Sequence, residues 1–525
     1  MTSRSDFREF ITADDGRFYF SSLPAGKYTL TARRRGYLPQ ALNQHEGFSS
    51  AVVVGPPIES SNIMFRLPPE SAISGTVLDE AGEPVRDAQV MLFQTGLVGG
   101  RHFTRRVGQT TTDDQGVYRF GHLPPRQFVV AVSARVWYAQ RPQPGRETVR
   151  MVVTDGGAST TATYGMVGKV SSGHSDTATS DVDSQTDPLD VVYPITFYAG
   201  TTEPSTASPI ALKPGEKYVA DISLQPVPAL HLRFPADSGG TQGQNRFVTL
   251  EEKLSDGIAL PILAETRTTA SGAMELVGVP PGHYTATVRQ FPTVQQAGAG
   301  NAGAELQPQV EELDAVNSGE VQAAHVSGAQ LSVSLQLDPG STRPTQSYLQ
   351  LLNMNTRDYY NELVTEKGDV VFKQPIPPGT YELALTNGRG EFIRAISALG
   401  AQVSGRTVQI REARTVKLGI SIGHGMGQVT GTVLRSGKPF AGAMVVLVPA
   451  DPGNKAILFR RDQSDSDGTF TLAGAIPGKY TVVAIENGWD LEWLNPDVIK
   501  AYLAKGVPLE VMPNGKYDVT VNLQR

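Results

Sequence analysis

The chain has 525 residues and a formal net charge of −6, so it is too long for one hydrophobic core and lacks the positive charge that binds nucleic acid. It contains no cysteine, which excludes disulfides, thiolate metal sites and a cysteine nucleophile. With 54 glycines, 36 prolines and 19% charged residues, the composition favours short strands joined by tight turns, and we predict an all-β fold.

One sequence pattern recurs five times along the chain. Each copy has a glycine at an entry turn, apolar residues two and four positions later, a proline-containing loop, and then an aromatic residue. Alternation of period two on both sides of the loop predicts two half-buried strands in each copy, arranged as a hairpin. The entry glycines are Gly16, Gly116, Gly272, Gly368 and Gly468.

The loop of each copy has its own glycine and aromatic positions. A loop glycine precedes the aromatic residue by two positions in four copies, whereas Arg126 takes this place in the second copy. We expect these glycines to lie where another side chain would be strained, and the loop at Arg126 to turn differently. The residues of this structural repeat are Gly26 with Tyr28, Phe128 without a glycine, Gly282 with Tyr284, Gly379 with Tyr381, and Gly478 with Tyr480.

In chain order, the copies predict five units with breaks near residues 68, 227, 338 and 425. The first unit, 1–68, lacks the opening half of the pattern, so we expect a partial sandwich with exposed sheet edges, as from a start site placed too far downstream or from a fragment. Units 69–227 and 426–525 show both halves, and their opening strands contain I-S-G-T-V from Ile73 and V-T-G-T-V from Val429. Units 228–338 and 339–425 show the second half only.

Three stretches differ from the strand pattern. Residues 155–187 are small and polar, with too little apolar surface to offset the entropy of ordering, so they predict a disordered insertion in the second unit. Residues 295–304 predict a second such loop. In the fifth unit, Asn495 followed by Pro496, with Gly506 further on, predicts one short helix that has Asn495 as its N-cap.

The repeated residues resemble the carboxypeptidase regulatory-like domain family. The shared motifs are the S/T-G-T-V strand, the D-G-x-F/Y turn and the L-P-x-G-x-Y loop, which cover both halves of the second and fifth units and one half of the others. The resemblance implies a tandem array of transthyretin-like or Ig-like antiparallel β-sandwiches, similar to the B repeats of collagen adhesins and to starch-binding-like domains. The family is a scaffold with many uses, so it implies little about function.

None of the candidate catalytic or metal-binding motifs has the context that its chemistry needs. No histidine is followed by glutamate three residues later, so the H-x-x-E zinc pair of metallocarboxypeptidases is absent. The G-x-S-x-G at Ser421 lies in an alternating strand, and the G-x-G-x-x-G at 298–303 lies in a low-complexity stretch. The D-S-D-G at Asp465 lacks the closing glutamate of a calcium loop. We predict no enzyme activity, no catalytic or metal-binding residue and no cofactor; weak calcium binding at the Asp-Gly turns stays open.

Aromatic residues outside the repeat strands are the remaining functional candidates. Such rings can stack on the faces of sugars, or they can pack over the open end of a sandwich, and the sequence leaves both alternatives open. The candidate ligand-binding residues are Trp137, Tyr138, Tyr193, Tyr198, Trp489 and Trp493.

We therefore expect a non-catalytic β-sandwich array that acts as a structural, adhesive or protein-binding module, with carbohydrate binding through exposed aromatic residues as the alternative. The expected partner is a polysaccharide or another envelope protein. The resemblance implies an extracellular, periplasmic or outer-membrane-associated location. No stretch approaches the ~18 apolar residues of a membrane span, and the first residues lack the apolar region of a signal peptide.

Overall fold

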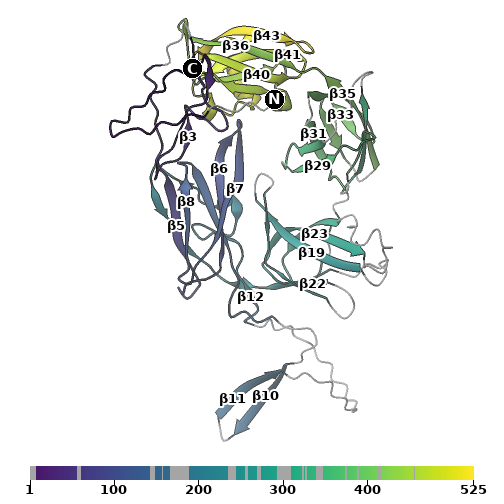
Figure 1. Cartoon of the computed structure of the whole chain (residues 1–525). Coiled ribbons are helices and arrows are strands. Elements are labelled where there is room, and N and C mark those ends of the chain that lie inside the picture. Colours follow the sequence, from purple (N-terminus) through teal and green to yellow (C-terminus); the bar gives the residue numbers. More distant parts are fainter. Residues whose placement is uncertain are drawn as a thin grey trace.

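The computed structural model describes residues 7–55, 61–141, 148–155, 158–165, 188–234, 244–254, 258–268, 274–292, 309–321, 324–325, 328–337, 347–356, 358–372, 375–386, 390–411, 415–453 and 456–525. It is an all-β structure in which four sandwiches, units two to five, follow one another around a closed loop (Figure 1). The residues before unit two, here called unit one, lie against unit five, so the two ends of the chain are close together.

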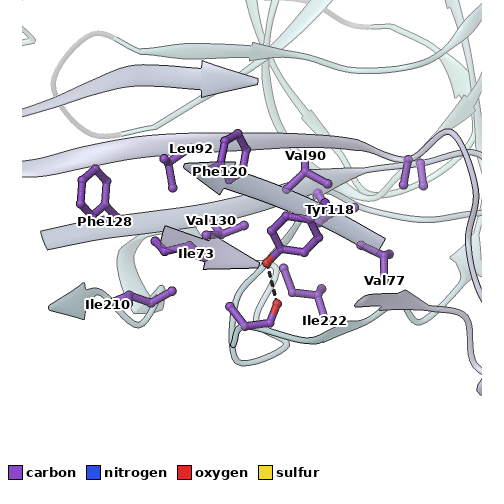
Figure 2. Packing of buried hydrophobic residues seen from close by; sticks show 14 of the residues in the cluster. Ile73, Val77, Val90, Leu92, Tyr118, Phe120, Phe128, Val130, Ile210 and Ile222 are labelled. Atoms are coloured by element: carbon purple, nitrogen blue, oxygen red, sulfur yellow. Dashed lines mark hydrogen bonds between the residues drawn. The ribbon is translucent and has the colours of Figure 1, made fainter. Parts of the chain in front are cut away.

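Unit two is a sandwich of two small sheets that share one core. The first sheet contains β5 (Ser71–Leu78), β8 (Val117–Leu123), β15 (Lys217–Val219) and β16 (Ile222–Ser223). The second contains β6 (Gln89–Val98), β7 (Arg101–Thr111), β9 (Gln127–Ser133), β13 (Thr196–Phe197) and β14 (Ile210–Ala211). Figure 2 shows the apolar residues of both sheets packed together, with the hydroxyl of Tyr118 donating to the carbonyl of Ala220 at 2.5 Å.

In units two to five, the two strands of the repeat copy pair with different partners on opposite sides of the sandwich. In unit two, β8 pairs with β5 while β9 pairs with β6. The repeat is therefore a corner between two sheets, and our expectation of a hairpin is wrong. Period-two alternation gives each strand an apolar face, but two strands that face one core from opposite sides show the same alternation as a paired hairpin.

A tyrosine fixes this corner in four of the five copies. The hydroxyls of Tyr28, Tyr284, Tyr381 and Tyr480 each donate to the backbone carbonyl four residues earlier, over 2.6–2.9 Å, as in the tyrosine corner of immunoglobulin-type sandwiches. The loop glycines do not have positive φ, which corrects our expectation of strain. A Cβ at Gly282 would instead lie 2.6 Å from the Tyr284 hydroxyl. In the second copy, Phe128 has no hydroxyl, and the same copy has Arg126 in place of the glycine.

Each sandwich closes when its last strand returns to pair in parallel with its first. β15 and β16 pair with β5 in this way. The glycine of the S-G-T-V motif lies at the crossing, since a Cβ at Gly75 would be 2.1 Å from the carbonyl oxygen of Ala220. Gly431 has the same position in unit five, where a Cβ would be 2.0 Å from the carbonyl oxygen of Val519. The motif thus marks the place where the closing strand approaches the opening strand.

Units three and four repeat this plan. Unit three has β18 (Leu230–Phe234), β21 (Glu265–Thr268), β22 (Met274–Val279) and β25 (Gly319–Glu320) in one sheet, and β19 (Gln244–Lys253), β20 (Ala259–Pro261), β23 (Gly282–Pro292), β24 (Gln309–Ala315) and β26 (Ala324–His325) in the other. Unit four has β27 (Gln330–Leu337), β30 (Asp369–Val371), β32 (Glu391–Leu399) and β35 (Thr415–His424), and β28 (Tyr348–Asn353), β29 (Tyr359–Leu363), β31 (Gly379–Thr386), β33 (Gln402–Ser404) and β34 (Thr407–Ile410). Because β27 pairs with β30 and β35 and packs in the core of unit four, it opens unit four, whereas we expected it to close unit three near residue 338.

Unit five carries the helix that the sequence predicts. Its strands are β36 (Gly427–Arg435), β37 (Lys438–Pro439), β40 (Thr469–Ala475) and β43 (Lys516–Gln524), with β38 (Met444–Pro449), β39 (Arg460–Gln463), β41 (Gly478–Ile485) and β42 (Val507–Val511) on the other side. The helix α1 (Pro496–Leu503) begins after Asn495, whose side chain accepts from the N–H of Asp497 at 3.0 Å. It packs on a second apolar cluster of unit five together with Trp489 and Trp493.

Unit one has very little core of its own. Its strands β1 (Gly26–Tyr28) and β4 (Val52–Val54) form one pair, and β2 (Thr31–Ala32) and β3 (Gln40–Ala41) form another. Residues 17–23, where we expected the first repeat strand, form no strand, and Phe18 and Phe20 stay half-exposed. Among the described residues of this unit, Leu42 and Val52 are the buried apolar side chains.

The insertion in unit two is partly described. β10 (Thr148–Asp155) and β11 (Ala158–Gly165) form an antiparallel hairpin, so residues 158–165 are a strand where we expected disorder; their threonines and tyrosine favour extended backbone. Residues 166–187 lie outside the described residues, as do Gly272 and the predicted loop at 295–304. A short pair formed by β12 (Val191–Val192) and β17 (Val227–Pro228) follows the insertion and leads to unit three.

Gly75→Ala should destabilise unit two, because the new Cβ would collide with the backbone of the closing strand. We expect the free energy of unfolding of this unit to fall by about 1–3 kcal/mol, measured by hydrogen-exchange mass spectrometry on peptides from β5 and β15. Gly121→Ala in the same unit is the control, since its Cβ would meet no atom within 4 Å, and it should change stability by less than about 0.5 kcal/mol. Equal effects of the two substitutions would contradict the role given to Gly75.

Candidate functional site

The aromatic residues singled out in the sequence lie in three places. Trp137, Tyr138 and Tyr193 gather around Glu80 in unit two. Tyr198 lies with Tyr218 at the edge of the unit-two core, and their hydroxyls are 3.0 Å apart. Trp489 and Trp493 lie in unit five. The structure therefore separates the candidates of unit two from those of unit five.

Trp489 and Trp493 are packed instead of being presented to solvent. Each is 6% exposed, and both belong to an apolar cluster with α1 and β38. Of the two alternatives that the sequence leaves open for these rings, ligand contact or packing, their burial favours packing, because other parts of the same chain cover them. Tyr193 is likewise buried, at 5% exposed.

The parts that cover the two tryptophans form a mixed aromatic and charged joint. The guanidinium carbon of Arg461 on β39 lies 5.3 Å from the centroid of the Trp489 ring and 5.1 Å from that of Trp493. It also lies 4.9 Å from the ring of Phe48, so one cation faces three aromatic rings. His45 stacks on Trp489 with the ring centroids 5.2 Å apart. We call this joint the clasp; it consists of His45, Glu46, Phe48, Arg461, Trp489 and Trp493.

Glu46 is the charged partner that completes the clasp. Its Oε2 accepts from Nη2 of Arg461, and its Oε1 accepts from the backbone N–H of Gly99 at 2.9 Å. Burial alone would raise the pKa of Glu46, but these hydrogen bonds outweigh burial and hold the pKa below its ordinary value of 4.5. The carboxylate is therefore charged and joins unit one to both unit five and unit two.

The β6–β7 turn of unit two supplies the third side of the clasp. Gly99 and Gly100 have φ of +64° and +77°, and a Cβ at Gly100 would lie 2.4 Å from the Trp493 ring. Next to this turn, Nε2 of His102 lies 2.8 Å from Oε1 of Glu492. Only glycine fits both the backbone conformation and the close approach, so the turn is shaped to meet unit five.

Hydrogen bonds, most of them between a side chain and a backbone group, extend the joint along residues 43–53, which we call the strap. Most of these bonds connect the strap to the turn between β39 and β40 in unit five, so the strap is held along its length and not only at Glu46. They run from Gln463 Nε2 to the carbonyl of Asn43 at 2.7 Å, from Ser50 Oγ to the carbonyl of Ser464 at 2.8 Å, from the Ala51 N–H to Asp465 Oδ1 at 2.7 Å, from the Ser466 N–H to the carbonyl of Ala51 at 2.9 Å, and from the Val53 N–H to Ser466 Oγ at 2.8 Å.

Three N–H groups inside the clasp have no acceptor among the described residues. They are Nη1 of Arg461 and Nε1 of both Trp489 and Trp493, and all three atoms are buried. A buried donor without a partner costs about 1–3 kcal/mol. The closed clasp therefore combines favourable cation–π and ion-pair contacts with an unfavourable term that water would relieve on opening.

The second aromatic site lies on unit two, around Glu80. Trp137 is 84% exposed, and its ring meets that of Tyr138 edge-on at 5.5 Å. Glu80 accepts hydrogen bonds from the hydroxyl of Tyr138 and, at 2.7 Å, from that of Tyr193. The bond to Glu80 is the main reason why the pKa of Tyr138 rises to about 12. The site thus presents one free ring face beside a carboxylate held by two phenols.

Sequence reasoning found the tryptophans but missed the residues that give them a role. Nothing local marks Glu46, Phe48 or Arg461, because Glu46 and Arg461 are 415 residues apart and lie in ordinary polar surroundings in the sequence. Glu80 lies in a turn after β5, where polar residues are common for structural reasons alone, so its position gives no sign of a functional role. The pair Gly99-Gly100 is a signal that could have found one side of the clasp, since adjacent glycines mark a tight turn.

Acid should open the clasp, and tryptophan fluorescence can report it. The chain has three tryptophans, so in a Trp137→Phe background only Trp489 and Trp493 emit. The closed clasp lowers the pKa of Glu46 below its ordinary value of 4.5. The charged carboxylate therefore stabilises the closed clasp fully above pH 4.5, and this stabilisation is lost as the pH falls through the lower pKa that Glu46 has in the closed clasp. We expect the emission to shift to the red as the pH is lowered below 4.5.

Glu46→Gln removes the group that titrates in this prediction. The variant should be partly open at neutral pH and should lose most of the acid-induced shift. Glu492→Gln, which changes a neighbouring carboxylate that contacts His102, is the control and should retain the shift. An unchanged titration in Glu46→Gln would show that another group controls the joint.

The described residues bring together no group of three or more His, Asp or Glu side chains that could hold a metal ion. None of the helices in this part of the chain has the length and apolar character needed to span a membrane.

Known proteins resemble the chain to different degrees. No curated protein matches it. Similar solved structures include the Bacillus anthracis TIE protein, at 12% identity over 83% of this chain and 68% of that chain with a TM-score of 0.15. They also include the Streptococcal ancillary pilin, at 12% identity over 56% and 98% with a TM-score of 0.20, and the RrgB pilus protein from Streptococcus pneumoniae, at 9% identity over 87% and 98% with a TM-score of 0.15. These TM-scores are too low to carry weight, and we draw no inference from them.

The family comparison is specific to unit two. The carboxypeptidase regulatory-like domain matches residues 72–163, which include the S-G-T-V strand, the D-Q-G turn and the corner at Phe128. This match confirms the resemblance that the motifs predict for this part of the chain. Unit two contains a carboxypeptidase regulatory-like domain.

Proposed function

We propose that the chain is a non-catalytic structural module of the cell envelope or the extracellular space, in which the clasp holds the sandwiches in a fixed, closed arrangement. The clasp is the observation that carries this proposal. It brings together the strap, the β6–β7 turn and unit five, and its contacts serve packing and ion pairing between these parts.

A second buried joint supports the same function. Asp190 is 8% exposed and lies between units two and three, where Nη1 of Arg141 is 2.8 Å from its Oδ1 and Nε2 of His231 is 2.6 Å from its Oδ2. Leu260 of unit three also packs on the outer face of the β6 and β9 sheet. A buried ion group is costly unless its partners stay in place, so this joint favours one orientation of the two units.

The matched family and these joints support the proposed location and class of partner. The matched family supplies accessory domains, and unit two keeps its sandwich without the zinc motif of the associated peptidases. A chain of sandwiches with fixed joints suits a spacer or a protein-binding surface outside the cytoplasm. Labelling of intact cells with an antibody against the chain, compared with permeabilised cells, tests this location; labelling only after permeabilisation would contradict it.

Small-angle X-ray scattering tests the closed arrangement. Arg461→Met removes the cation that faces three rings and the partner of Glu46, so we expect the radius of gyration and the maximum dimension to increase. Arg435→Met is the matched control: this arginine pairs with Glu486 at 3.1 Å, a contact that lies inside unit five, so its loss should leave the dimensions unchanged. A compact Arg461→Met variant would refute the structural role of the clasp.

The site around Glu80 favours carbohydrate binding as a second candidate function. Trp137 offers an exposed ring face for stacking on a sugar, and the neighbouring Tyr138 is hydrogen-bonded to the carboxylate of Glu80. Trp489 and Trp493 do not take part in this proposal, because they are buried.

Trp137→Ala should weaken retention on insoluble polysaccharides by at least about tenfold if this candidate is right. Tyr359→Ala provides the comparison, since Tyr359 is a 65% exposed ring on unit four and its loss should not matter. Circular dichroism would establish that both variants are folded. Absence of retention of the unchanged chain on every polysaccharide tested would remove the candidate.

A further inference from the structure

We propose that the clasp also forms between two copies of the chain, with the strap of one copy seated on unit five of the other, so that the protein assembles head to tail. This inference rests on the proposed function and deepens it by naming a partner, a second copy of this chain. The strap and its seat on unit five are complementary surfaces that come from opposite ends of the sequence and meet in the closed molecule.

Charge complementarity gives the two surfaces one register. The strap contributes an anion, Glu46, which pairs with the cation Arg461. Unit one also contributes a cation, Lys27, whose Nζ lies 2.6 Å from Oδ2 of Asp465. Unit one thus carries one anion and one cation, and unit five carries one cation and one anion opposite them. A reversed docking would bring like charges together.

Nothing in these contacts requires that both surfaces belong to the same molecule. The strap binds through its own side chains and extended backbone, and the seat consists of the β39–β40 turn with the residues of η4 (Gly488–Asp490) and the loop after it. If unit five leaves its own strap and receives that of another copy, the contacts between strap and seat are conserved. Such an exchange of identical elements is a low-cost route to assembly, and because the contact is heterologous it can close a dimer or extend a chain.

The closed monomer does not satisfy all its polar groups. Nη1 of Arg461 and Nε1 of Trp489 and Trp493 are buried and find no acceptor in the part of the chain that the structure describes. Opening the clasp would let water reach these donors and so offset part of the loss of packing. The opened state, with a free strap and a free seat, is the state from which a second copy is captured.

Two charge-reversal variants distinguish the clasp within one chain from the clasp between two chains. In Glu46→Arg, two arginines face each other within the monomer. In Arg461→Glu, two glutamates face each other within the monomer. Neither variant can close alone or bind its own kind. In a mixed dimer, the new arginine of one chain faces the new glutamate of the other, and the unchanged Glu46 and Arg461 face each other at the second joint, so both joints are restored.

Sedimentation velocity on Glu46→Arg, on Arg461→Glu and on their equimolar mixture tests the inference. We expect each variant to be monomeric and the mixture to contain a dimer at least ten times more abundant than in either solution alone. The double variant, Glu46→Arg with Arg461→Glu in one chain, controls for folding and for closure within one molecule, and scattering should show it as compact as the unchanged chain.

The outcomes separate this inference from the proposed function. A compact double variant with no dimer in the mixture would leave the clasp in place and overturn assembly through it. An extended double variant, with no dimer in the mixture, would refute the clasp itself. Dimers of equal abundance in all three solutions would also overturn the inference, because the association would not use Glu46 and Arg461.

Discussion

Every sandwich in this chain depends on one constraint: the last strand must return close enough to pair with the first. Small sheets bury their apolar faces only when two of them are pressed together, and the repeat corner carries the chain from one sheet to the other. The parallel pairing of β43 with β36 then closes the unit. Gly75 and Gly431 stand where the two backbones meet, and a methyl group there would meet a carbonyl oxygen at about 2 Å. The S/T-G-T-V motif, which contains both glycines, therefore marks the place where the two strands meet.

The sequence predicts the parts of the fold that depend on neighbouring residues. Alternation predicts the repeat strands of units two to five, and Asn495 with Pro496 predicts the only α-helix among the described residues. The sequence pattern does not show that the two strands of a repeat lie in opposite sheets. Alternation indicates which way a side chain points but not which strand is the pairing partner. For the same reason β27 was placed at the end of unit three, although its partners β30 and β35 belong to unit four.

The clasp was beyond prediction from sequence for a related reason. Trp489 and Trp493 stood out by residue type, but their burial is decided by Phe48 and Glu46, hundreds of residues away. A tryptophan that covers an interface and one that binds a sugar have the same local sequence, since both need an apolar body and a polar edge. Trp137 shows the difference: it is the one tryptophan that no distant segment covers, and it stands 84% exposed.

Unit one explains why the clasp involves these residues. With two-stranded pairs and a half-exposed repeat strand region at Phe18 and Phe20, it buries too little apolar surface to be stable alone. Its order comes from the strap, whose backbone bonds to the β39–β40 turn replace the sheet partners it lacks. Unit one therefore relies on its contacts with unit five for much of its support, and the Glu46–Arg461 pair contributes both to the support of the strap and to the closure of the array. The stability of the N-terminal segment and the shape of the whole chain are consequences of the same contact.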